Sequence, residues 1–229
     1  MILDPKNAEN WTVYENDGIL KNAARFHGKR TNNPNATVLD YQKPLLDEAL
    51  SFVMNWNTAI DGGAHYGLMS YHLNSLFKKV HSFEIDHNIR NCLKDNVQKF
   101  NLDNVAVYDF GLGECEKMVS VLRPKNKSFS THIDPGKSTG EYLIKSIDSL
   151  NLDSLDFIKL DCEGYETYIL QGAIESIKKF KPVIMMERKH LSLLWGLDKF
   201  APTRVLEQIG YKEVVSYGKD CIATYQGNI

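Results

Sequence analysis

From Thr58 onwards, short apolar segments alternate with segments that have the periodicity of an α-helix. The expected strands are residues 57–61, 79–84, 104–111, 117–124, 155–161 and 182–188. The expected helices between them are residues 66–77, 89–100 and 169–180. A helix between two strands lets the second strand run in the same direction as the first, which builds a parallel sheet. The sequence therefore predicts an α/β fold with a mostly parallel sheet.

The C-terminal segment follows a different pattern. A helix is expected near residues 202–209, followed by strands at residues 211–217 and 221–226. Only the segment Gly-Lys-Asp separates these two strands. A connection this short joins antiparallel neighbours. We therefore expect the sheet to end in an antiparallel hairpin.

The composition argues against several classes of protein. The chain has 229 residues, of which 43% are apolar and 24% charged, and its net charge is −2. This balance gives no electrostatic reason to expect nucleic acid or a membrane surface as a partner. No apolar segment approaches the ~20 residues of a membrane span, and the N-terminus lacks the apolar core of a signal peptide. The four cysteines are scattered, so we expect a cytoplasmic protein with reduced thiols.

The segment TAIDGGAHYGLMSYHL, residues 58–73, is typical of a strand that enters a glycine turn and then a helix. Such a turn presents backbone N–H groups and the positive end of the helix dipole at the carboxyl edge of the sheet. Glycine at these positions would let a ligand approach the backbone. The spacing Asp61-x-Gly63-x-x-x-Gly67 differs from the GxGxxG of dinucleotide folds. By itself it could equally be a tight turn in which Asp61 caps the helix.

Acidic residues stand at the ends of three successive predicted strands: Asp61, Glu84 and Asp109. Glu84 follows the glycine turn by about twenty residues, where an acid can accept hydrogen bonds from ribose hydroxyls. Asp109 could meet an adenine amino group. One acid at a strand end is often a helix cap, but three beside one glycine turn favour a nucleoside pocket.

Four segments between Thr58 and Arg188 together resemble the FkbM family of S-adenosylmethionine-dependent methyltransferases. IDGGAHYG is similar to the family's DxGAxxG loop, and HSFEIDHNIRNCLKDN to its FExxxxxxxxLxxN segment. FGLGE lies where the family has a short glycine-containing stretch. LDFIKLDCEGYETYILQGA resembles the signature DxxKxDxEGxExxxLxGA almost position by position. The chain departs from the family in having Ile85 where proline is usual and Gly62 where a branched residue is usual.

The resemblance implies a Rossmann-like class I methyltransferase fold, with a seven-stranded sheet, helices on both faces and an antiparallel last strand. It implies one methyltransferase domain over residues 41–229, preceded by an extension, residues 1–40, that could cap the acceptor side. The implied cofactor is S-adenosylmethionine. The residues implied to bind it are Asp61, Gly63, Ala64, Tyr66, Gly67, Glu84, Ile85, Asp109, Gly111 and Asp161.

Further acids at strand ends are the candidates for catalysis. Asp161 and Glu163 follow the strand at residues 155–161, and Glu187 and His190 follow the next strand. We expect Asp161 and Glu163 near the transferred methyl group, with Glu187 or His190 as the proton acceptor. The expected acceptor is a hydroxyl on a sugar, a glycan or a small polar metabolite, and the oligomeric state is left open.

Simpler roles are open for several of these residues. Glu166 could merely favour a helix N-terminus, and His190 could be an ordinary loop residue. Cys162, within a strand, is better explained as a core residue than as a nucleophile. The acid cluster could also hold Mg²⁺, although our assignment includes no metal ligand.

Other functional classes stay open as alternatives. A nicotinamide-dependent oxidoreductase would normally carry GxGxxG, and a methyltransferase acting on base amines an N/DPPY-like segment where DCEG stands. A non-catalytic module that binds the nucleoside would not need the acids at residues 161–187. The polar stretch at residues 125–140 is predicted to be a loop, either a surface excursion or an active-site lid.

Overall fold

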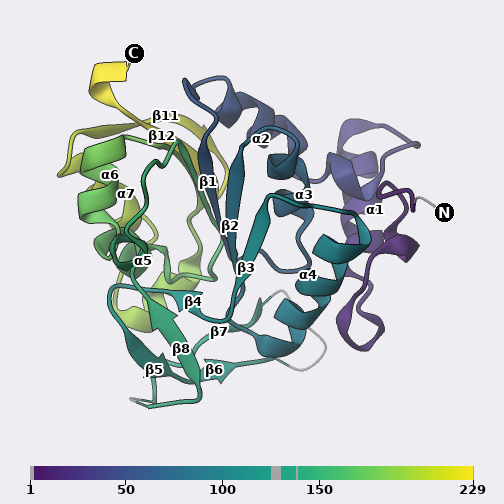
Figure 1. The fold of residues 1–229 in the computed structure, drawn as a ribbon, viewed down its shortest axis with the longest axis horizontal. Coiled ribbons are helices and arrows are strands. Elements are labelled where there is room, and N and C mark those ends of the chain that lie inside the picture. Colours follow the sequence, from purple (N-terminus) through teal and green to yellow (C-terminus); the bar gives the residue numbers. More distant parts are fainter. Residues whose placement is uncertain (1–2, 125–129, 138, 229) are drawn as a thin grey trace.

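The computed structural model describes residues 3–124, 130–137 and 139–228, and Figure 1 shows its fold. The strands of the main sheet are β1 Thr58–Gly62, β2 Lys79–Phe83, β3 Val105–Tyr108, β9 Phe157–Leu160, β10 Val183–Glu187, β11 Tyr211–Tyr217 and β12 Asp220–Tyr225. The α-helices are α1 Ile19–Thr31, α2 Lys43–Leu50, α3 Leu68–Asn74, α4 His87–Lys99, α5 Glu166–Gln171, α6 Ile174–Phe180 and α7 Ala201–Glu207. Among the described residues, no helix combines the length and hydrophobicity that a membrane crossing would require.

The main sheet has seven strands in the order β11-β12-β10-β9-β1-β2-β3. The pairs from β10 through β9, β1 and β2 to β3 are parallel, whereas β12 is antiparallel to both of its neighbours. This arrangement confirms the predicted fold class, including the C-terminal hairpin. The strand order reverses between β1 and β9, and ligands of open α/β sheets bind at such a point, outside the carboxyl ends of the strands.

Helices cover both faces of the sheet. One hydrophobic cluster joins Ile60, Ile158 and Ile184 to residues of α5, α6 and α7. The neighbouring strand residues pack on the opposite face against α2 and α3, in a second cluster that includes Ala59 and Phe157. Because successive strand residues point to opposite faces, strands buried on both sides are apolar nearly throughout. The central strands therefore hold the site in a fixed frame.

A smaller β-region follows β3. Its short strands are β4 Gly111–Leu112, β5 Lys117–Val119, β6 Val121–Leu122, β7 His132–Ile133 and β8 Tyr142–Lys145. The predicted strand at 104–111 therefore stops at Tyr108, and the one at 117–124 is divided between two small sheets, β4-β8-β5 and β6-β7. Part of the predicted loop, residues 125–129 and 138, lies outside the described residues.

The predicted helix at residues 169–180 is two helices, α5 and α6, with a break at Gly172. A Cβ atom on Gly172 would lie 2.2 Å from the carbonyl oxygen of Gly113, so the two backbones touch at this point. Six 3₁₀-helices complete the described secondary structure: η1 Ala8–Asn10, η2 Tyr14–Asn16, η3 Val38–Asp40, η5 Asp148–Leu150, η6 His190–Trp195 and η7 Gln226–Asn228.

The N-terminal segment packs beside α3 and α4, at the side of the sheet where β3 forms the edge (Figure 1). The side-chain amide of Asn96 on α4 holds this segment in place, because its oxygen accepts from the N–H of Thr12 at 2.6 Å and its nitrogen donates to the Thr12 carbonyl at 2.9 Å.

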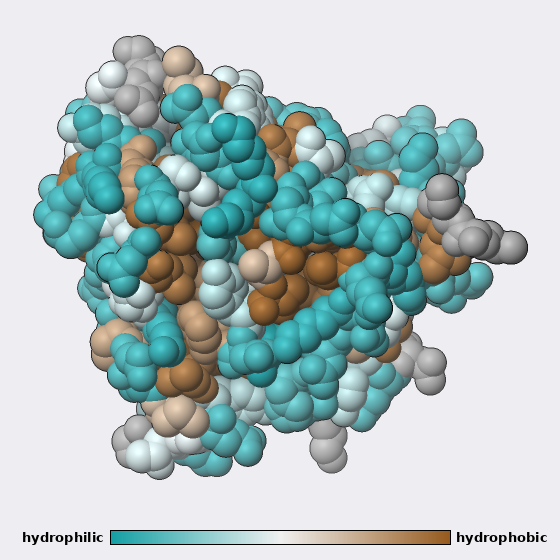
Figure 2. All heavy atoms as spheres, in the orientation of Figure 1, coloured by the Kyte–Doolittle hydropathy of each residue, from teal (hydrophilic) through white to brown (hydrophobic). Residues whose placement is uncertain are grey.

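In the same orientation, the space-filling view shows hydrophobic side chains in a hollow near β3 and α4, bordered by hydrophilic ones (Figure 2). Residues far apart in the sequence thus form one wall of the molecule.

Candidate active site

A cavity of about 590 Å³ opens at the carboxyl ends of β1, β2, β9 and β10, where the strand order reverses. This volume is within the usual range of small-molecule sites. Its lining comes from α1, the glycine loop after β1, the ends of β2 and β9, the β4 and β7 strands, and the segment after β10. The predicted site residues in the lining are Gly63, Ala64, Tyr66, Glu84, Ile85, Gly111, Asp161, Glu163 and Glu187.

The glycine loop is held by contacts within the protein. The N–H groups of Gly63 and Ala64 both donate to the Phe83 carbonyl, at 3.0 and 2.9 Å. Gly63 has φ +71°, and a Cβ there would lie 2.0 Å from the Asp161 carbonyl oxygen. Gly67, with φ +91°, would place a Cβ 2.6 Å from Leu93. Protein packing therefore accounts for these two glycines, and the expectation that they let a ligand approach the backbone stays a prediction, since Gly63 also lines the cavity.

Asp61 is buried beneath this loop and does not line the cavity. Its Oδ2 accepts a hydrogen bond from Ser70 Oγ at 2.6 Å, which ties the end of β1 to α3. The alternative role of Asp61, as the N-cap of the helix after the loop, is not observed, because the N-cap of α3 is Gly67. Asp61 can therefore influence a ligand only through its neighbours.

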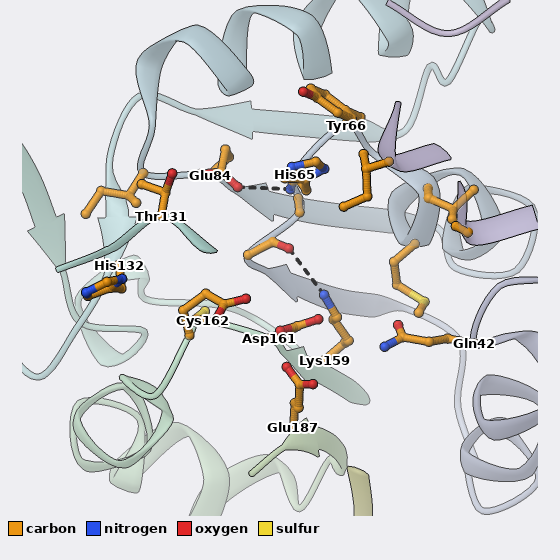
Figure 3. A pocket seen from close by; sticks show the side chains of 18 of the residues that line it. Gln42, His65, Tyr66, Glu84, Thr131, His132, Lys159, Asp161, Cys162 and Glu187 are labelled. Atoms are coloured by element: carbon orange, nitrogen blue, oxygen red, sulfur yellow. Dashed lines mark hydrogen bonds between the residues drawn. The ribbon is translucent and has the colours of Figure 1, made fainter. Parts of the chain in front are cut away.

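Glu84 lies at the end of β2, inside the cavity (Figure 3). Its Oε2 accepts from the His65 N–H at 3.0 Å and its Oε1 from the Asp86 N–H at 2.9 Å. Each carboxylate oxygen has a second lone pair, so the side chain can still accept from a ligand. Burial raises the pKa of Glu84 to about 7, with the Asp86 N–H acting in the opposite direction.

An apolar slot lies next to Glu84. Ile85 follows it in the chain, and Phe83, Leu112 and Ile133 pack in the same hydrophobic cluster. The Thr131 hydroxyl also faces this part of the cavity (Figure 3). Its oxygen is buried and makes no hydrogen bond within the described part of the chain. The slot thus offers apolar surface for a flat ring and one hydroxyl that has no hydrogen-bond partner among the residues that the structure describes.

The structure does not bring Asp109 into this cavity. Its side chain is 73% exposed and pairs with Lys94 and Arg90 of α4. The chain turns outward after Tyr108, so Asp109 borders a separate, smaller cavity. Gly111, two residues later, does line the main cavity and packs against Ile85.

The ends of β9 and β10 bring three carboxylates together. One oxygen from each of Asp161, Glu163 and Glu187 lies within 4.8 Å of the others, a spacing that a divalent cation could bridge. In the structure the Lys189 ammonium contacts all three, at 3.2 Å from Asp161 and 2.6 Å from Glu187. The Lys219 ammonium also pairs with Glu187. The acids therefore carry their own counter-ions.

Burial and the neighbouring charges shift the pKa values of Asp161 and Glu187 in opposite directions. Burial raises the pKa of Glu187 to about 8, and the charge of Asp161 and a hydrogen bond with Asp161 act in the same direction. For Asp161, burial raises the pKa, but the charges of Lys159 and Lys189 and the bond with Glu187 outweigh it and hold the pKa below its ordinary value. The pair thus combines an ionised carboxylate with a group able to exchange a proton near neutral pH.

Glu163 has the left-handed backbone conformation, with φ +53°, which a residue other than glycine seldom adopts. Glu166 secures this turn, because its Oε1 accepts from the N–H groups of Cys162 at 2.7 Å and Gly164 at 3.3 Å. Strained residues of this kind are concentrated at functional sites. Glu166 itself does not line the cavity, so its contacts favour the simpler role in the turn.

His190 begins η6, is exposed, and does not line the cavity. The strand ends at Glu187, and Lys189 rather than His190 turns back to the acids. Lys159 and Lys189 also line the cavity but were not among the predicted site residues. A lysine within the apolar segment FIKL was the available signal, since a strand buried on both faces holds a lysine only with a partner.

The N-terminal segment contributes to the cavity wall. The lining includes Ile19, Asn22 and Phe26 from α1, together with Tyr41 and Gln42 before α2. The Tyr66 hydroxyl joins this segment to the glycine loop, since it donates to Asp17 Oδ2 at 3.0 Å. The cavity thus has one side formed by residues outside the sheet.

Comparisons with known proteins identify the family of this chain and the fold that it shares with solved structures. The model of the methyltransferase FkbM domain matches residues 61–212. A search of curated proteins finds no match. Methyltransferase FkbM from Methylobacillus flagellatus KT superposes with a TM-score of 0.53 at 19% identity, covering 74% of this chain and 44% of that one. The chain thus spans less than half of the Methylobacillus protein, and the likeness shows a shared fold.

Two other solved structures are more distant. Precorrin-6y C5,15-methyltransferase from Geobacter metallireducens GS-15 gives a TM-score of 0.47 at 17% identity, covering 80% of this chain and 88% of that one. A SAM-dependent methyltransferase from Aquifex aeolicus gives 0.46 at 15% identity, covering 80% and 87%. The family model matches well over half of the sequence, and the resemblance of the motifs is confirmed: the chain belongs to the FkbM methyltransferase family.

Proposed function

We propose that this protein uses S-adenosylmethionine to methylate a hydroxyl group of a sugar, a glycan or another small polar molecule. The observation that carries the proposal is the joining of two groups of residues in one cavity: the buried Glu84 beside an apolar slot, and the cluster of Asp161, Glu163 and Glu187. The first group suits a nucleoside, and the second suits proton transfer beside a positive charge. Membership of a methyltransferase family supports the same reaction.

The residues present fit the proposed cofactor. Glu84 can accept from ribose hydroxyls, and the slot formed by Phe83, Ile85 and Leu112 can hold adenine. Thr131 Oγ1, which is buried without a hydrogen-bond partner among the described residues and lines the same cavity, could form a hydrogen bond with a polar atom of the ring. When bound, S-adenosylmethionine would supply an electrophilic methyl group on a sulfonium. Asp161, held ionised, offers a negative charge for that sulfonium.

Glu187 is the candidate proton acceptor. A hydroxyl becomes a good nucleophile only as its proton leaves, so a base must lie within hydrogen-bond reach. Glu187 is 2% exposed, lines the cavity, and has a pKa of about 8 because of burial and the nearby Asp161. At neutral pH most of a group with this pKa is protonated, so only its deprotonated fraction acts as the base, and that fraction grows as pH rises towards 8. Lys189 and Lys219 hold its carboxylate in place.

The acceptor would bind between the acid cluster and the N-terminal segment. Tyr41, Gln42 and Lys219 supply polar groups there, and α1 supplies the outer wall. These contacts suit a small polar acceptor better than a polymer of high charge. In this proposal residues 1–40 serve acceptor binding rather than cofactor binding.

The direct test is methyl transfer from cofactor labelled in its methyl group. The purified protein would be incubated with pooled cell metabolites and glycans, and the labelled products would be assigned by mass spectrometry. We expect label on oxygen. Label found on nitrogen or sulfur alone would contradict the assignment of the acceptor, and calorimetry showing affinity for NAD but none for S-adenosylmethionine would contradict the assignment of the cofactor.

Replacement of Glu84 by glutamine should weaken the binding of S-adenosylhomocysteine by about 1–3 kcal/mol, because the charged acceptor of the ribose hydroxyls is lost. In the wild-type protein affinity should decrease as pH falls below about 7, since the carboxylate becomes protonated there. The variant should lack this decrease. Calorimetry at pH values from about 5.5 to about 8 measures both the loss of affinity and its pH dependence.

A matched control for this experiment is Glu116→Gln, which changes an exposed acid paired with Lys145 away from the cavity. Its affinity and pH dependence should equal those of the wild type. A Glu84→Gln protein that is folded by circular dichroism and binds with unchanged affinity would show that Glu84 does not contact the ligand.

A further inference from the structure

Lys159 is a buried lysine that the proposed reaction does not use. It lies in the middle of β9, is 5% exposed, and has Asp61 and Met185 as its neighbours in register on β1 and β10. Its ammonium reaches the floor of the cavity (Figure 3). Burial of a charged group lowers stability unless partners compensate the charge. The presence of a lysine at this buried position therefore needs an explanation.

Two contacts hold the ammonium. Lys159 Nζ donates to the carbonyl oxygen of Gly63 at 3.2 Å and lies 3.6 Å from Asp61 Oδ1. Asp61 Oδ1 has no hydrogen-bond partner within the described residues, so this ion pair is its main compensation. The lysine thus joins the glycine loop to the strand that carries Asp161, two residues further on.

The positive charge of Lys159 also acts on Asp161. It is the foremost of the influences that lower the pKa of that carboxyl against the effect of burial. Other titratable groups that face Asp161 come from every surrounding element: His65, Tyr41, Glu163, Glu166, Glu187, Lys189, Lys219 and Asp220. Among Lys159, Lys189 and Lys219, Lys159 is the most buried, and its ammonium donates to the glycine loop.

We propose that Lys159 is a positioning residue, which fixes the glycine loop through the Gly63 carbonyl and keeps Asp161 negatively charged towards the sulfonium of the cofactor. This inference rests on the proposed function of the site. It accounts for a buried charge in a strand that would pack well with an apolar residue. An ion pair with a purely structural role would be replaceable by a neutral pair without any effect on the choice of ligand.

The test compares two variants, Asp61→Asn and the double variant Asp61→Asn/Lys159→Met. Lys159→Met alone would leave Asp61 as an uncompensated buried charge and could prevent folding. The double variant removes both charges, so its comparison with Asp61→Asn isolates the contribution of the lysine. Calorimetry would measure the affinities for S-adenosylmethionine and S-adenosylhomocysteine at several pH values. Because both ligands carry the same ribose, the ratio of their affinities cancels the titration of Glu84.

We expect the double variant to bind both S-adenosylmethionine and S-adenosylhomocysteine at least tenfold more weakly than Asp61→Asn does at pH 7, because the glycine loop loses its hydrogen bond from Lys159. The ratio of the S-adenosylmethionine affinity to the S-adenosylhomocysteine affinity should also begin to fall at a higher pH in the double variant than in Asp61→Asn, because loss of the Lys159 charge raises the pKa of Asp161. Equal ratios in the two variants, with both proteins folded, would overturn the role of Lys159. Failure of the wild-type protein to bind either ligand would instead overturn the proposed function.

Discussion

Replacing Glu187 by glutamine should lower the rate of methyl transfer by about 10²–10⁴-fold, the usual contribution of a general base. Glutamine keeps the size of the side chain but cannot take up a proton. Of the three clustered acids, Glu187 is the most buried, and its pKa of about 8 reflects that burial and the charge of Asp161. The rate is measured with labelled cofactor and the acceptor found in the metabolite screen.

The pH dependence provides an independent check of this role. Only the deprotonated form of Glu187 can accept a proton, so kcat/KM of the wild-type protein should rise with pH and level off above about 8. The Glu187→Gln protein should show no rise of this kind. Its affinity for S-adenosylhomocysteine should remain within about threefold of wild type, which would exclude misfolding as the cause. A variant with the wild-type rate would remove Glu187 from the mechanism and leave Glu163 as the next candidate.

The order of the main elements could be predicted because it depends on local signals. The segments around β1, β2, β9 and β10 are apolar runs that end in a turn or an acid, and the segment Gly-Lys-Asp marks the hairpin. The features that the sequence did not predict depend on contacts between residues far apart in the chain. The helix α5 ends before Gly172, whose backbone lies against Gly113 and whose carbonyl accepts from the Asp148 N–H, and no local pattern in the sequence indicates these contacts.

The N-terminal segment also depends on long-range contacts that local sequence patterns do not report. Helix α1 contains Gly28, and the segment that precedes it is held by contacts of Thr12 and Asp17 with distant parts of the chain. Thr12 meets Asn96 across 84 positions of sequence, and Asp17 meets Tyr66 across 49. No local pattern can report such pairs, so the wall formed by α1 could not be predicted from periodicity.

The position of a residue at a strand end predicted which residues lie near the candidate site. The direction in which each side chain points could not be predicted from the sequence. Glu84, Asp161 and Glu187 stand at strand ends, and the parallel sheet brings such positions to one edge. Asp109 follows the same rule in sequence, but β3 is the edge strand, and the chain turns outward after it. Lys189 was overlooked because it follows the strand end, yet its side chain folds back over the acids.

The contact between the glycine loop and β9 leads to a second large effect. Gly63→Ala should lower the free energy of unfolding by about 3–5 kcal/mol, which combines the cost of a left-handed residue with that of overpacking. The added Cβ would lie 2.0 Å from the carbonyl oxygen of Asp161, and a backbone atom cannot move aside as a flexible side chain can. Urea denaturation followed by circular dichroism measures the change.

Gly218→Ala is the matched control, because Gly218 has a similar φ of +67° but no atom within 4 Å of the added Cβ. It should cost only the conformational part, about 1–2 kcal/mol. The difference between the two variants therefore measures the steric contact itself. Since the clash pushes on Asp161, Gly63→Ala should also weaken the binding of S-adenosylmethionine, whereas Gly218→Ala should leave it unchanged. Equal destabilisation by the two substitutions would show that the loop can withdraw from β9, and that glycine is needed at position 63 for its backbone conformation alone.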